Sequence, residues 1–595
     1  MMKTRNIIIS LLIASGLSSC FNLDLTPEGV LSTADPFTTT GEMRNYINQF
    51  YESAVLVQNM SAGGGSGICG TDINSDNMAA SSPVTRINGG LSVANASALT
   101  YYNNIRNVNF FLNNLGNYPD PSQTDFCQLA GEGYYFRAWY YFQLLKDYGP
   151  VSIVKIPLDP DSKQMKLARD KRTDVADFII EDLKTAIDNL GEQSSCATMR
   201  IHKDVARAFL SEVALYEGTW EKYHKAKNDR FFDPSVTDAK INGYFQIAAD
   251  AAKAVMDRNV WSISTGGGTA DAYRSIFATE DLSSNKEILW FKRYDGDQIG
   301  NSVDRYLNTG GAGVGATASL VDDYLTIDGR PFVGDERENA KNRYGEELLP
   351  TVRDPRLAQT IAAPGQKIHP DGTILYYSPL NGNGSAYGTN TTGYSILKHN
   401  QIDYTGNVEA ENKGSTPAIQ FRYADVLLNY AEALAEMDGA GNASKIIAAV
   451  QPLRDRVGMP AMDFDREYNT STDYPFRNLN KYIQAVRRER RVEQAIEGRR
   501  LTDIFRWAAA EELLRGWWPT GARYVGTDLE EHFREQLTIG TSILVNAKGD
   551  IVPLNPSTAA FDGGYGFRLD RDYLLPIQER MISLTNALWE QNPGW

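Results

Sequence analysis

The sequence has no second apolar run after the one near its N-terminus, and its acidic side chains outnumber its basic ones. A membrane-spanning helix needs about 20 consecutive apolar residues, and the N-terminal run Ile7–Ile13 is far shorter. The chain of 595 residues carries a formal net charge of −15 at pH 7. Nucleic acids and anionic membrane surfaces attract basic faces, so this charge argues against both as partners.

Cysteine and histidine are also scarce. The chain has four cysteines, Cys20, Cys69, Cys127 and Cys196, and five histidines that show no metal-ligand spacing. If Cys20 is modified, three thiols remain, which is an odd number for a disulfide framework; one bridge or none is expected. The G-x-S-x-G, H-E-x-x-H and Walker patterns of common catalytic sites do not occur.

The first residues have the pattern of a secretory signal. Lys3 and Arg5 precede the run Ile7–Ile13, and small residues lead to Leu17-Ser18-Ser19-Cys20. A cysteine at the cleavage point is typical of a bacterial lipoprotein, in which the thiol takes a fatty-acyl group such as palmitate. We therefore expect residues 1–19 to be removed and Cys20 to carry a lipid anchor, which binds membranes through acyl-chain burial.

Several segments of the N-terminal half have helical periodicity. In Gly131–Tyr148, apolar residues recur at spacings of one, three and four. The segments with this pattern are Asn95–Leu115, Gly131–Tyr148, Thr173–Leu190, Lys203–Trp220 and Tyr244–Arg258. Consecutive amphipathic helices with short connections indicate helix pairs stacked as a solenoid.

The pattern changes from about Val260 to Thr416, where glycine and asparagine become dense and short β-type runs such as Ile288–Phe291 appear. This composition predicts loops and short strands. Helical patterns return at Arg422–Glu436, Ala443–Arg456, Tyr482–Glu497 and Arg499–Leu514. The expected organisation is a signal peptide (1–19), a lipid-anchored tether (20–40), a helical part (41–260), a loop-rich ligand-binding region (261–416) and a second helical part with the tail (417–595).

An ordered set of segments resembles the SusD/RagB family of surface nutrient-binding lipoproteins. The set consists of Leu23-Asp24-Leu25-Thr26-Pro27 after Cys20, Gly131–Ala138, Asp147-Tyr148-Gly149-Pro150-Val151, Arg422–Leu428 with Glu432-Ala433, Leu453–Gly458, Arg488–Arg491, Glu493, Glu497–Arg500, Asp503 with Arg506-Trp507, Leu575-Pro576-Ile577 and Gln591-Asn592-Pro593-Gly594. The resemblance covers nearly the whole mature chain in family order.

The resemblance implies a mostly α-helical fold in which four tetratricopeptide-like helix pairs support an inserted irregular region that holds the ligand. The protein would lie on the extracellular face of the outer membrane and act as a lid on a SusC-like TonB-dependent transporter. It would bind an oligosaccharide, or in some members a peptide, and would not be an enzyme. The chain departs from the family pattern at one place. Family members that bind starch-like glycans often have a tryptophan about four residues before the tyrosine of Tyr102-Asn103-Asn104-Ile105. This chain has Ala98 near that place. A starch-type ligand is therefore less expected.

Acidic residues at two places invite a catalytic or metal-binding interpretation. Glu489, Glu493 and Glu497 lie on one helix face among arginines, which favours a structural ion-pair lattice because arginine neighbours keep carboxylates ionised. The segment Asp72–Asn77 resembles a calcium loop but lacks the glycine and glutamate of an EF-hand. We expect no cofactor or metal site, with a structural calcium left open.

The glycine pattern at Gly311–Ala316 lacks the strand and helix of a dinucleotide loop.

Glycan binding uses flat aromatic faces that stack on pyranose rings and planar polar groups that bond to hydroxyl pairs. Exposed loop residues of these types are therefore the candidates: Asp72, Asn74, Asp76, Asn77, Arg86, Tyr294, Tyr306, Tyr376, Tyr377, Tyr387, Asn390 and Tyr394, with Asn383 nearby. Many tyrosines only anchor loops on a scaffold. Trp261 and Trp290 are expected in the core, while Trp517-Trp518 is compatible with a surface patch or with packing.

Three alternatives to a glycan-binding lipoprotein remain open. The first is a peptide-binding member of the same family. The second is a surface glycoside hydrolase, which would need an acid and a base converging in a cleft. The third is an assembly scaffold that uses its helical repeats to hold other proteins.

Overall fold

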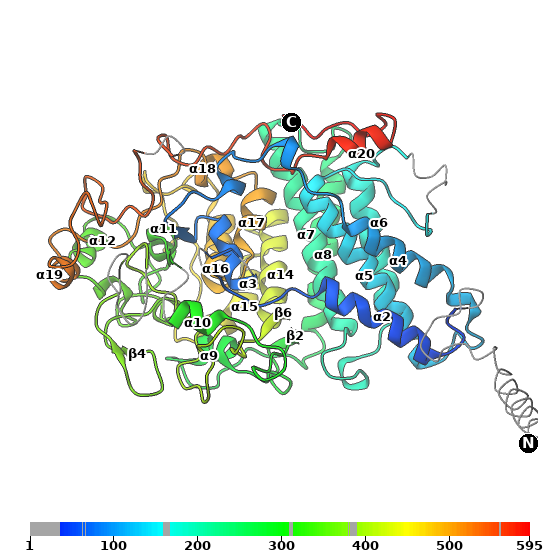
Figure 1. The fold of residues 1–595 in the computed structure, drawn as a ribbon, viewed down its shortest axis with the longest axis horizontal. Coiled ribbons are helices and arrows are strands. Elements are labelled where there is room, and N and C mark those ends of the chain that lie inside the picture. Colours follow the sequence, from blue (N-terminus) through cyan, green and yellow to red (C-terminus); the bar gives the residue numbers. More distant parts are fainter. Residues whose placement is uncertain are drawn as a thin grey trace, which may run out of the picture.

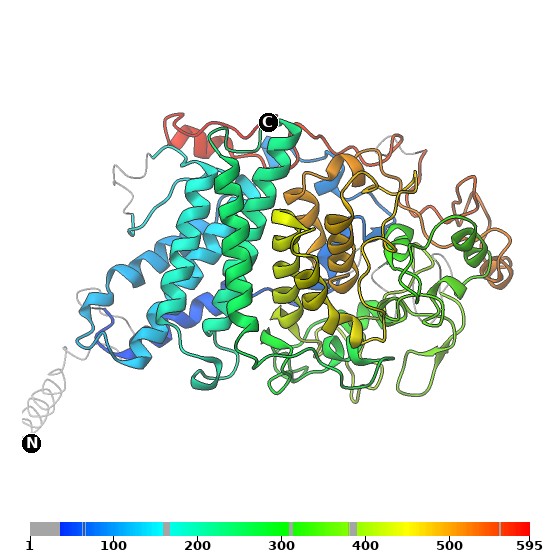
Figure 2. The same cartoon turned by 180° about the vertical axis from the view of Figure 1, so that it is seen from behind.

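Helices dominate the fold of the chain, seen here in a computed structural model that describes residues 36–61, 64–65, 67–158, 167–308, 313–378, 380, 390–557 and 561–595. The N-terminal helical set consists of α2 (Thr40–Ala54), α4 (Tyr101–Asn113), α5 (Thr124–Tyr148), α6 (Arg172–Asn189), α7 (Lys203–Lys227) and α8 (Asp238–Met256). The C-terminal set consists of α14 (Tyr423–Asp438), α15 (Ala443–Asp455), α16 (Lys481–Glu493) and α17 (Arg500–Arg506). Figures 1 and 2 show the two sets side by side.

Neighbouring helices pack against one another in each set, as α5 does on α6, α7 on α8 and α14 on α15, and α14 and α17 join the sets by packing on α8 and α7. Buried residues on α7 explain this packing, because Val205, Phe209, Val213, Tyr216 and Trp220 recur every three or four positions. The prediction of a mostly helical fold built from tetratricopeptide-like pairs is confirmed.

Several helix ends differ from the sequence prediction. The predicted helix Arg499–Leu514 is two helices, α17 and α18 (Ala510–Leu513), because Ala508 has a φ of 48° between them. The helix predicted over Tyr482–Glu497 ends at Glu493, and Ile496 then adopts a φ of 60°. Positive φ is unfavourable for an isoleucine and ends a right-handed helix, and periodicity alone does not reveal it.

The rest of the chain, which includes the segment between the two helical sets, contains only short elements. They are α3 (Gly67–Gly70), α9 (Ala272–Ala278), α10 (Val303–Asn308), α11 (Ala318–Asp323), α12 (Gly334–Lys341), α13 (Arg356–Thr360), α19 (Asp528–Phe533) and α20 (Glu579–Leu584). The strands pair antiparallel as β1 (Met78–Ala80) with β3 (Val314–Ala316), β2 (Ile288–Lys292) with β6 (Ala418–Arg422), and β4 (Gln366–Lys367) with β5 (Ile374–Leu375). The loop-rich segment thus contains short helices as well as the expected strands, and Figure 1 shows it at the end of the molecule away from α4–α6.

The C-terminal tail returns to the N-terminal helices. The Leu575 amide donates to the Asp147 carbonyl at 2.7 Å, just before α5 ends at Tyr148. Gly149 has a φ of 70°, and a Cβ at this position would lie 2.9 Å from Leu574 Cδ1. Two segments of the family pattern, far apart in sequence, are therefore joined in space, and α20 is brought beside α6 (Figure 1).

The structure shows the state of three cysteines and the position of two tryptophans. Cys69, Cys127 and Cys196 are free thiols, so these three form no disulfide with one another. Trp261 and Trp290 are buried in the main core, as predicted.

A buried ion-pair network connects the helical sets to the loop-rich segment. Glu493 on α16 accepts from Arg422 at 2.7 Å, from Arg456 at 2.6 Å and from Arg356 at 3.0 Å. The four side chains are almost completely buried. Glu489 extends the network to Arg356 at 2.6 Å. Arg356 belongs to α13, Arg422 ends β6 and Arg456 follows α15, so one carboxylate joins three parts of the chain.

The charge state of these carboxylates follows from their neighbours. Burial alone would raise the pKa of Glu493, but Arg456, Arg422 and Arg356 hold it well below its ordinary value. The pKa values of Glu489 and Glu497 are lowered in the same way, against the effect of burial. A general acid needs a raised pKa, so these residues form the structural lattice that the sequence predicted.

Replacing Glu493 with glutamine should lower the free energy of unfolding by about 3 to 5 kcal/mol, because it leaves buried arginines without their carboxylate. Because its pKa is depressed, Glu493 contributes stability above its ordinary pKa of about 4.3, and this contribution is lost as the pH falls. Urea titrations at pH 7 and in acid measure both effects, and the gap between wild type and Glu493→Gln should narrow in acid.

Glu221 on α7 provides a matched control. It is also buried, but burial and the neighbouring Glu217 raise its pKa to about 9, which favours a neutral carboxyl at pH 7. Glu221→Gln should therefore cost less than about 1 kcal/mol. Equal losses for the two variants would contradict the assignment of Glu493 as the ionised centre of the network.

Candidate functional site

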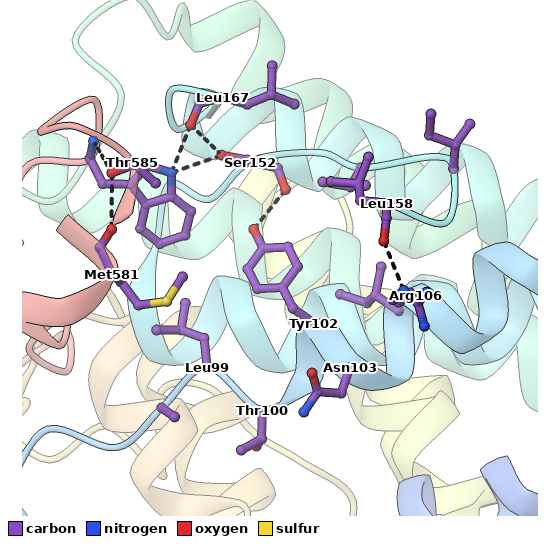
Figure 3. A pocket seen from close by; sticks show the side chains of 15 residues that line it. Leu99, Thr100, Tyr102, Asn103, Arg106, Ser152, Leu158, Leu167, Met581 and Thr585 are labelled. Atoms are coloured by element: carbon purple, nitrogen blue, oxygen red, sulfur yellow. Dashed lines mark hydrogen bonds between the residues drawn. The ribbon is translucent and has the colours of Figure 1, made fainter. Parts of the chain in front are cut away.

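A groove of about 600 Å³ lies between the start of α4, the segment after α5 and the tail helix α20 (Figure 3). Its walls consist of Ala98, Leu99, Thr100, Tyr102, Asn103, Ile105, Arg106, Ser152, Val154, Ile156, Leu158, Leu167, Met581, Thr585 and Trp589. Volumes of this size are typical of small-molecule sites. The groove therefore draws on three segments that are distant in sequence.

Two aromatic rings form one corner of the groove. Tyr102 and Trp589 have ring centroids 6.2 Å apart at an interplanar angle of 59°. The Tyr102 hydroxyl donates to the Ser152 carbonyl at 2.8 Å, and Trp589 Nε1 donates to Ser152 Oγ and to the Leu167 carbonyl, each at 3.0 Å (Figure 3). These bonds fix both rings, so the corner is formed before any ligand binds.

The wall opposite α20 is held by side chains of α4 and α5. Asn109 Nδ2 donates to the Val154 carbonyl at 2.8 Å, and the Tyr141 hydroxyl accepts from the Val154 amide at 2.7 Å. Arg106 Nε donates to the Leu158 carbonyl at 2.9 Å. The segment therefore satisfies its backbone groups through polar side chains, while Ile156 remains 40% exposed at the edge.

The lining divides into an apolar floor and a polar rim. Leu99 and Ile105 are buried on the α4 side, whereas Thr100, Asn103 and Arg106 are exposed. An apolar floor with amide and guanidinium groups at its edge suits a ligand that has an apolar face and hydrogen-bonding groups around it. Ala98 lines the same groove. Trp589 is only 3% exposed, so it supports the half-buried Tyr102 ring from behind and offers a ligand little surface of its own.

The candidates predicted in the loop 72–77 are mostly used inside the protein. Asp76 is buried and accepts from Arg500 Nε at 2.7 Å, with Arg491 Nη2 at 2.9 Å from its carboxylate. Asn77 accepts from Arg491 and donates to Asp72, and both Asn77 and Asp72 are buried. The expectation that these three side chains are exposed is wrong, because they attach the loop to α16 and α17.

Asn74 and the carboxylates of this loop do not form a calcium site in the described part of the chain. Asn74 is half-buried and donates to the Thr71 carbonyl at 3.1 Å. Burial raises the pKa of Asp72 to about 6, whereas Arg491 and Arg500 overcome burial and lower the pKa of Asp76. Where the chain is described, no three His, Cys, Asp or Glu side chains converge in a way that would hold a metal ion.

Three further candidates are buried in the loop-rich segment, contrary to the expectation of exposed groups. Tyr294 is 4% exposed and its hydroxyl accepts from the Gln58 amide at 3.0 Å. Tyr394 is fully buried and donates to Glu347 Oε1 at 3.3 Å. Asn390 is buried and donates to Ser378 Oγ at 2.9 Å. These rings and amides anchor loops, and no face of either tyrosine is open to a ligand.

The other candidates are more accessible but lie apart. Arg86 is half-buried, donates to the Asp572 carbonyl at 2.6 Å and lies over the Phe505 ring, so it ties its loop to the tail. Tyr306 and Tyr377 are half-buried; Tyr306 donates to Glu411 at 3.2 Å and Tyr377 stacks on His532 with centroids 4.4 Å apart. Tyr376 is 66% exposed and stays a candidate for ligand contact.

Two of the sequence candidates, Tyr387 and the neighbouring Asn383, lie outside the described residues, as does Cys20. None of the described candidates lines the groove between α4 and α20. The sequence carried one pointer to this groove, the segment Tyr102-Asn103 beside Ala98. Nothing in the sequence indicated that Trp589 would join it.

The family of the chain follows from comparison with known proteins. A model described as "SusD family" matches residues 275–595, which is more than half of the chain. The chain belongs to the SusD family. A second family model, described as "Starch-binding associating with outer membrane", matches residues 29–215. SusD-like protein P38 of Formosa agariphila is 24% identical over 400 residues, covering 65% of this chain and 68% of that protein.

Solved structures share the SusD-like fold. A SusD-like carbohydrate binding protein from Bacteroides fragilis superimposes with a TM-score of 0.70 at 21% identity, covering 92% of this chain and 98% of that one. A laminarin binding SusD-like protein gives a TM-score of 0.52 at 19% identity, covering 93% of this chain and 97% of that one. In the part of this chain that the structure describes, no helix is both long and apolar enough to span a membrane.

Replacing Asn103 with alanine should weaken ligand binding about 3- to 10-fold, because it removes one hydrogen-bonding amide from the groove rim. Asn104→Ala is the matched control, since this neighbour is absent from the groove lining. Isothermal titration calorimetry measures both. An Asn103→Ala variant that binds as tightly as wild type, with every ligand the wild type takes, would remove Asn103 from the site.

Proposed function

We propose that this SusD-family protein is a cell-surface lipoprotein that captures an oligosaccharide and delivers it to a SusC-like TonB-dependent transporter in the outer membrane. The observation that carries the proposal is the groove between α4 and α20, in which the Tyr102 ring, backed by the buried Trp589, and an apolar floor lie beside the polar rim of Thr100, Asn103 and Arg106. An aromatic and apolar wall accommodates the C–H face of a sugar ring, and the rim groups bond to its hydroxyls.

The names of similar proteins support a glycan as the ligand. One relative of the same fold is described as carbohydrate binding, another as laminarin binding, and the model matched by the N-terminal part as starch-binding. The absence of a tryptophan at Ala98 makes this platform different from that of the starch binders. A glycan other than starch is therefore the preferred ligand.

The proposal assigns binding rather than catalysis to this protein. The carboxylates that invited a hydrolytic interpretation, Glu489, Glu493 and Glu497, are ion-paired and have lowered pKa values. Burial raises the pKa values of Asp304 and Glu347 to about 7, but neither residue lines the groove. A glycosidase needs an acid and a second carboxylate on either side of the scissile bond, and among the described residues that line the groove there is no Asp or Glu.

A peptide is the second candidate ligand, and the aliphatic character of the groove favours it. Most of the lining area belongs to carbon atoms, with Val154, Ile156, Leu158 and Leu167 along one wall. Apolar side chains of a peptide would fit these positions, as they fit other hydrophobic grooves. A scaffold that only holds other proteins is less favoured, because its helical surface would not need a preformed groove.

Affinity electrophoresis and calorimetry of the full mature chain against polysaccharides, neutral oligosaccharides and peptides decide between these ligands. We expect binding to one glycan class without release of shorter sugars. Binding to peptides alone would replace the glycan with the second candidate. Release of shorter sugars by the purified protein would overturn the non-catalytic assignment.

Cys20→Ala should abolish incorporation of a fatty-acid probe and release the protein from the outer membrane, because the thiol at the cleavage point would be the acylated group. Metabolic labelling with an alkynyl fatty acid followed by membrane fractionation measures this. Cys196→Ala, which removes a free thiol elsewhere in the chain, should label like wild type. Unchanged labelling of Cys20→Ala would refute the anchor.

A further inference from the structure

A second cavity, of about 480 Å³, lies on the far side of the C-terminal helical set from the groove. Its walls come from α11, α12, the loop before α16 and the segment that follows α18. Figure 1 shows α11 and α12 at the end of the molecule opposite to α4 and α20. The lining includes Asp322, Arg337, Tyr474, Trp517, Arg523 and Asp550. No residue lines both cavities.

Trp517 provides an aromatic platform in this cavity. The ring is half-buried and stacks on Tyr565, with centroids 5.5 Å apart and an interplanar angle of 15°. Because Tyr565 covers one face, the side of Trp517 that lines the cavity is held rigidly. The adjacent Trp518 points elsewhere: it packs edge-on against Phe561 at 4.9 Å and is absent from the lining. Of the two neighbouring tryptophans, Trp517 therefore lines the cavity and Trp518 packs inside the protein.

The charges around the cavity balance. The lining contains the basic residues Arg337, Lys341, Arg491, Arg500, Arg523 and Lys548 and the acidic residues Asp322, Asp323, Glu338, Asp473, Glu512 and Asp550. Close pairs neutralise most of them, as in Arg337 with Asp473 at 2.7 Å, Arg523 with Asp550 at 2.6 Å and Lys341 with Asp322 at 2.8 Å. A strongly anionic or cationic ligand would meet like charges as well as opposite ones, so a neutral polar ligand suits this site.

One donor and one acceptor in the cavity lack partners. Arg337 Nε and Asp322 Oδ1 are both buried and make no hydrogen bond with any described residue. The two side chains are neighbours, since Arg337 Nη1 lies 3.9 Å from Asp322 Oδ2. Buried polar atoms without partners are costly. Both side chains also line the cavity and are partly exposed, Arg337 by 16% and Asp322 by 24%, so a sugar hydroxyl there would donate to the carboxylate or accept from the guanidinium.

We propose that this cavity is a second binding site for a neutral oligosaccharide, with Trp517 stacking on a sugar ring and Arg337 and Asp322 bonding to its hydroxyls. The inference extends the proposed function, on which it depends for the ligand class, by giving the chain two separate points of contact for glycan. Two sites on one chain would retain a long glycan more strongly than a short one, because the second contact becomes intramolecular.

The test uses the full mature chain and a panel of neutral hexasaccharides built from glucose, mannose, galactose or xylose, followed by calorimetry. Wild type should bind at least one hexasaccharide at two sites. Trp517→Ala should weaken one of the two by about 10-fold or more, because it removes a stacked ring, while Trp518→Ala leaves both sites unchanged. Thermal melting of each variant identifies any loss that comes from unfolding.

Arg337→Gln provides an independent variant, with Arg343→Gln as its control. Arg343 is an exposed arginine that pairs with Glu346 and does not line the cavity. Arg337→Gln should weaken the same site as Trp517→Ala, whereas Arg343→Gln should not. A single binding site in wild type, or two sites that both variants leave intact, overturns the second site.

The outcomes separate this inference from the proposed function. Wild type that binds no glycan in any assay refutes the proposed function, and the second site with it. Binding that Asn103→Ala weakens and that neither Trp517→Ala nor Arg337→Gln changes supports the groove and refutes the second site alone. Binding of peptides in the second cavity in place of hexasaccharides also refutes the inference as stated.

Discussion

The arrangement of the whole molecule depends on one buried carboxylate, Glu493. Its three arginine partners come from α13, from the end of β6 and from the residue after α15. An unpaired charge at such a depth would be strongly unfavourable, so the loop-rich segment keeps its place only while these groups stay together. The same network stabilises the turn after α16, where Ile496 holds a left-handed conformation while Lys398 Nζ donates to the Ala495 carbonyl at 2.7 Å. Local strain of this kind persists where surrounding contacts determine the backbone.

This network also explains why polar loop residues are poor guides to the ligand site in this fold. Asp76 and Asn77 have the composition of a sugar-binding loop, yet Arg491 and Arg500 bind them inside the protein. A large irregular segment must satisfy many buried backbone and side-chain groups, since it has few regular ladders to do so. Its polar and tyrosine residues are therefore needed for its own structure. The proposed groove lies instead where a regular helix forms the wall and residues near its end stay exposed, as Asn103 does on α4.

The helical architecture could be predicted from the sequence because apolar periodicity survives in each long helix, as in the stripe from Val205 to Trp220. Helix ends were less predictable, because Ala508 and Ile496 adopt positive φ values that tertiary contacts impose. The groove could not be predicted, because it joins Tyr102 to Trp589 across nearly the whole length of the chain. Periodicity carries no information on which distant segments meet. Only Ala98, seen against the family pattern, marked the region.

The two cavities lie on opposite sides of a rigid helical body, and their walls differ in chemistry. The groove is fixed by hydrogen bonds from Tyr102 and Trp589 to one short segment, so its aromatic corner needs no rearrangement to bind a ligand. The second cavity is lined by ion pairs, such as Arg337 with Asp473 and Arg523 with Asp550, beside the half-buried ring of Trp517. Preformed sites lose little conformational entropy on binding. A scaffold held together by buried charges can therefore present two unlike surfaces, and the proposal that both bind one extended glycan requires no large rearrangement of the helices that carry them.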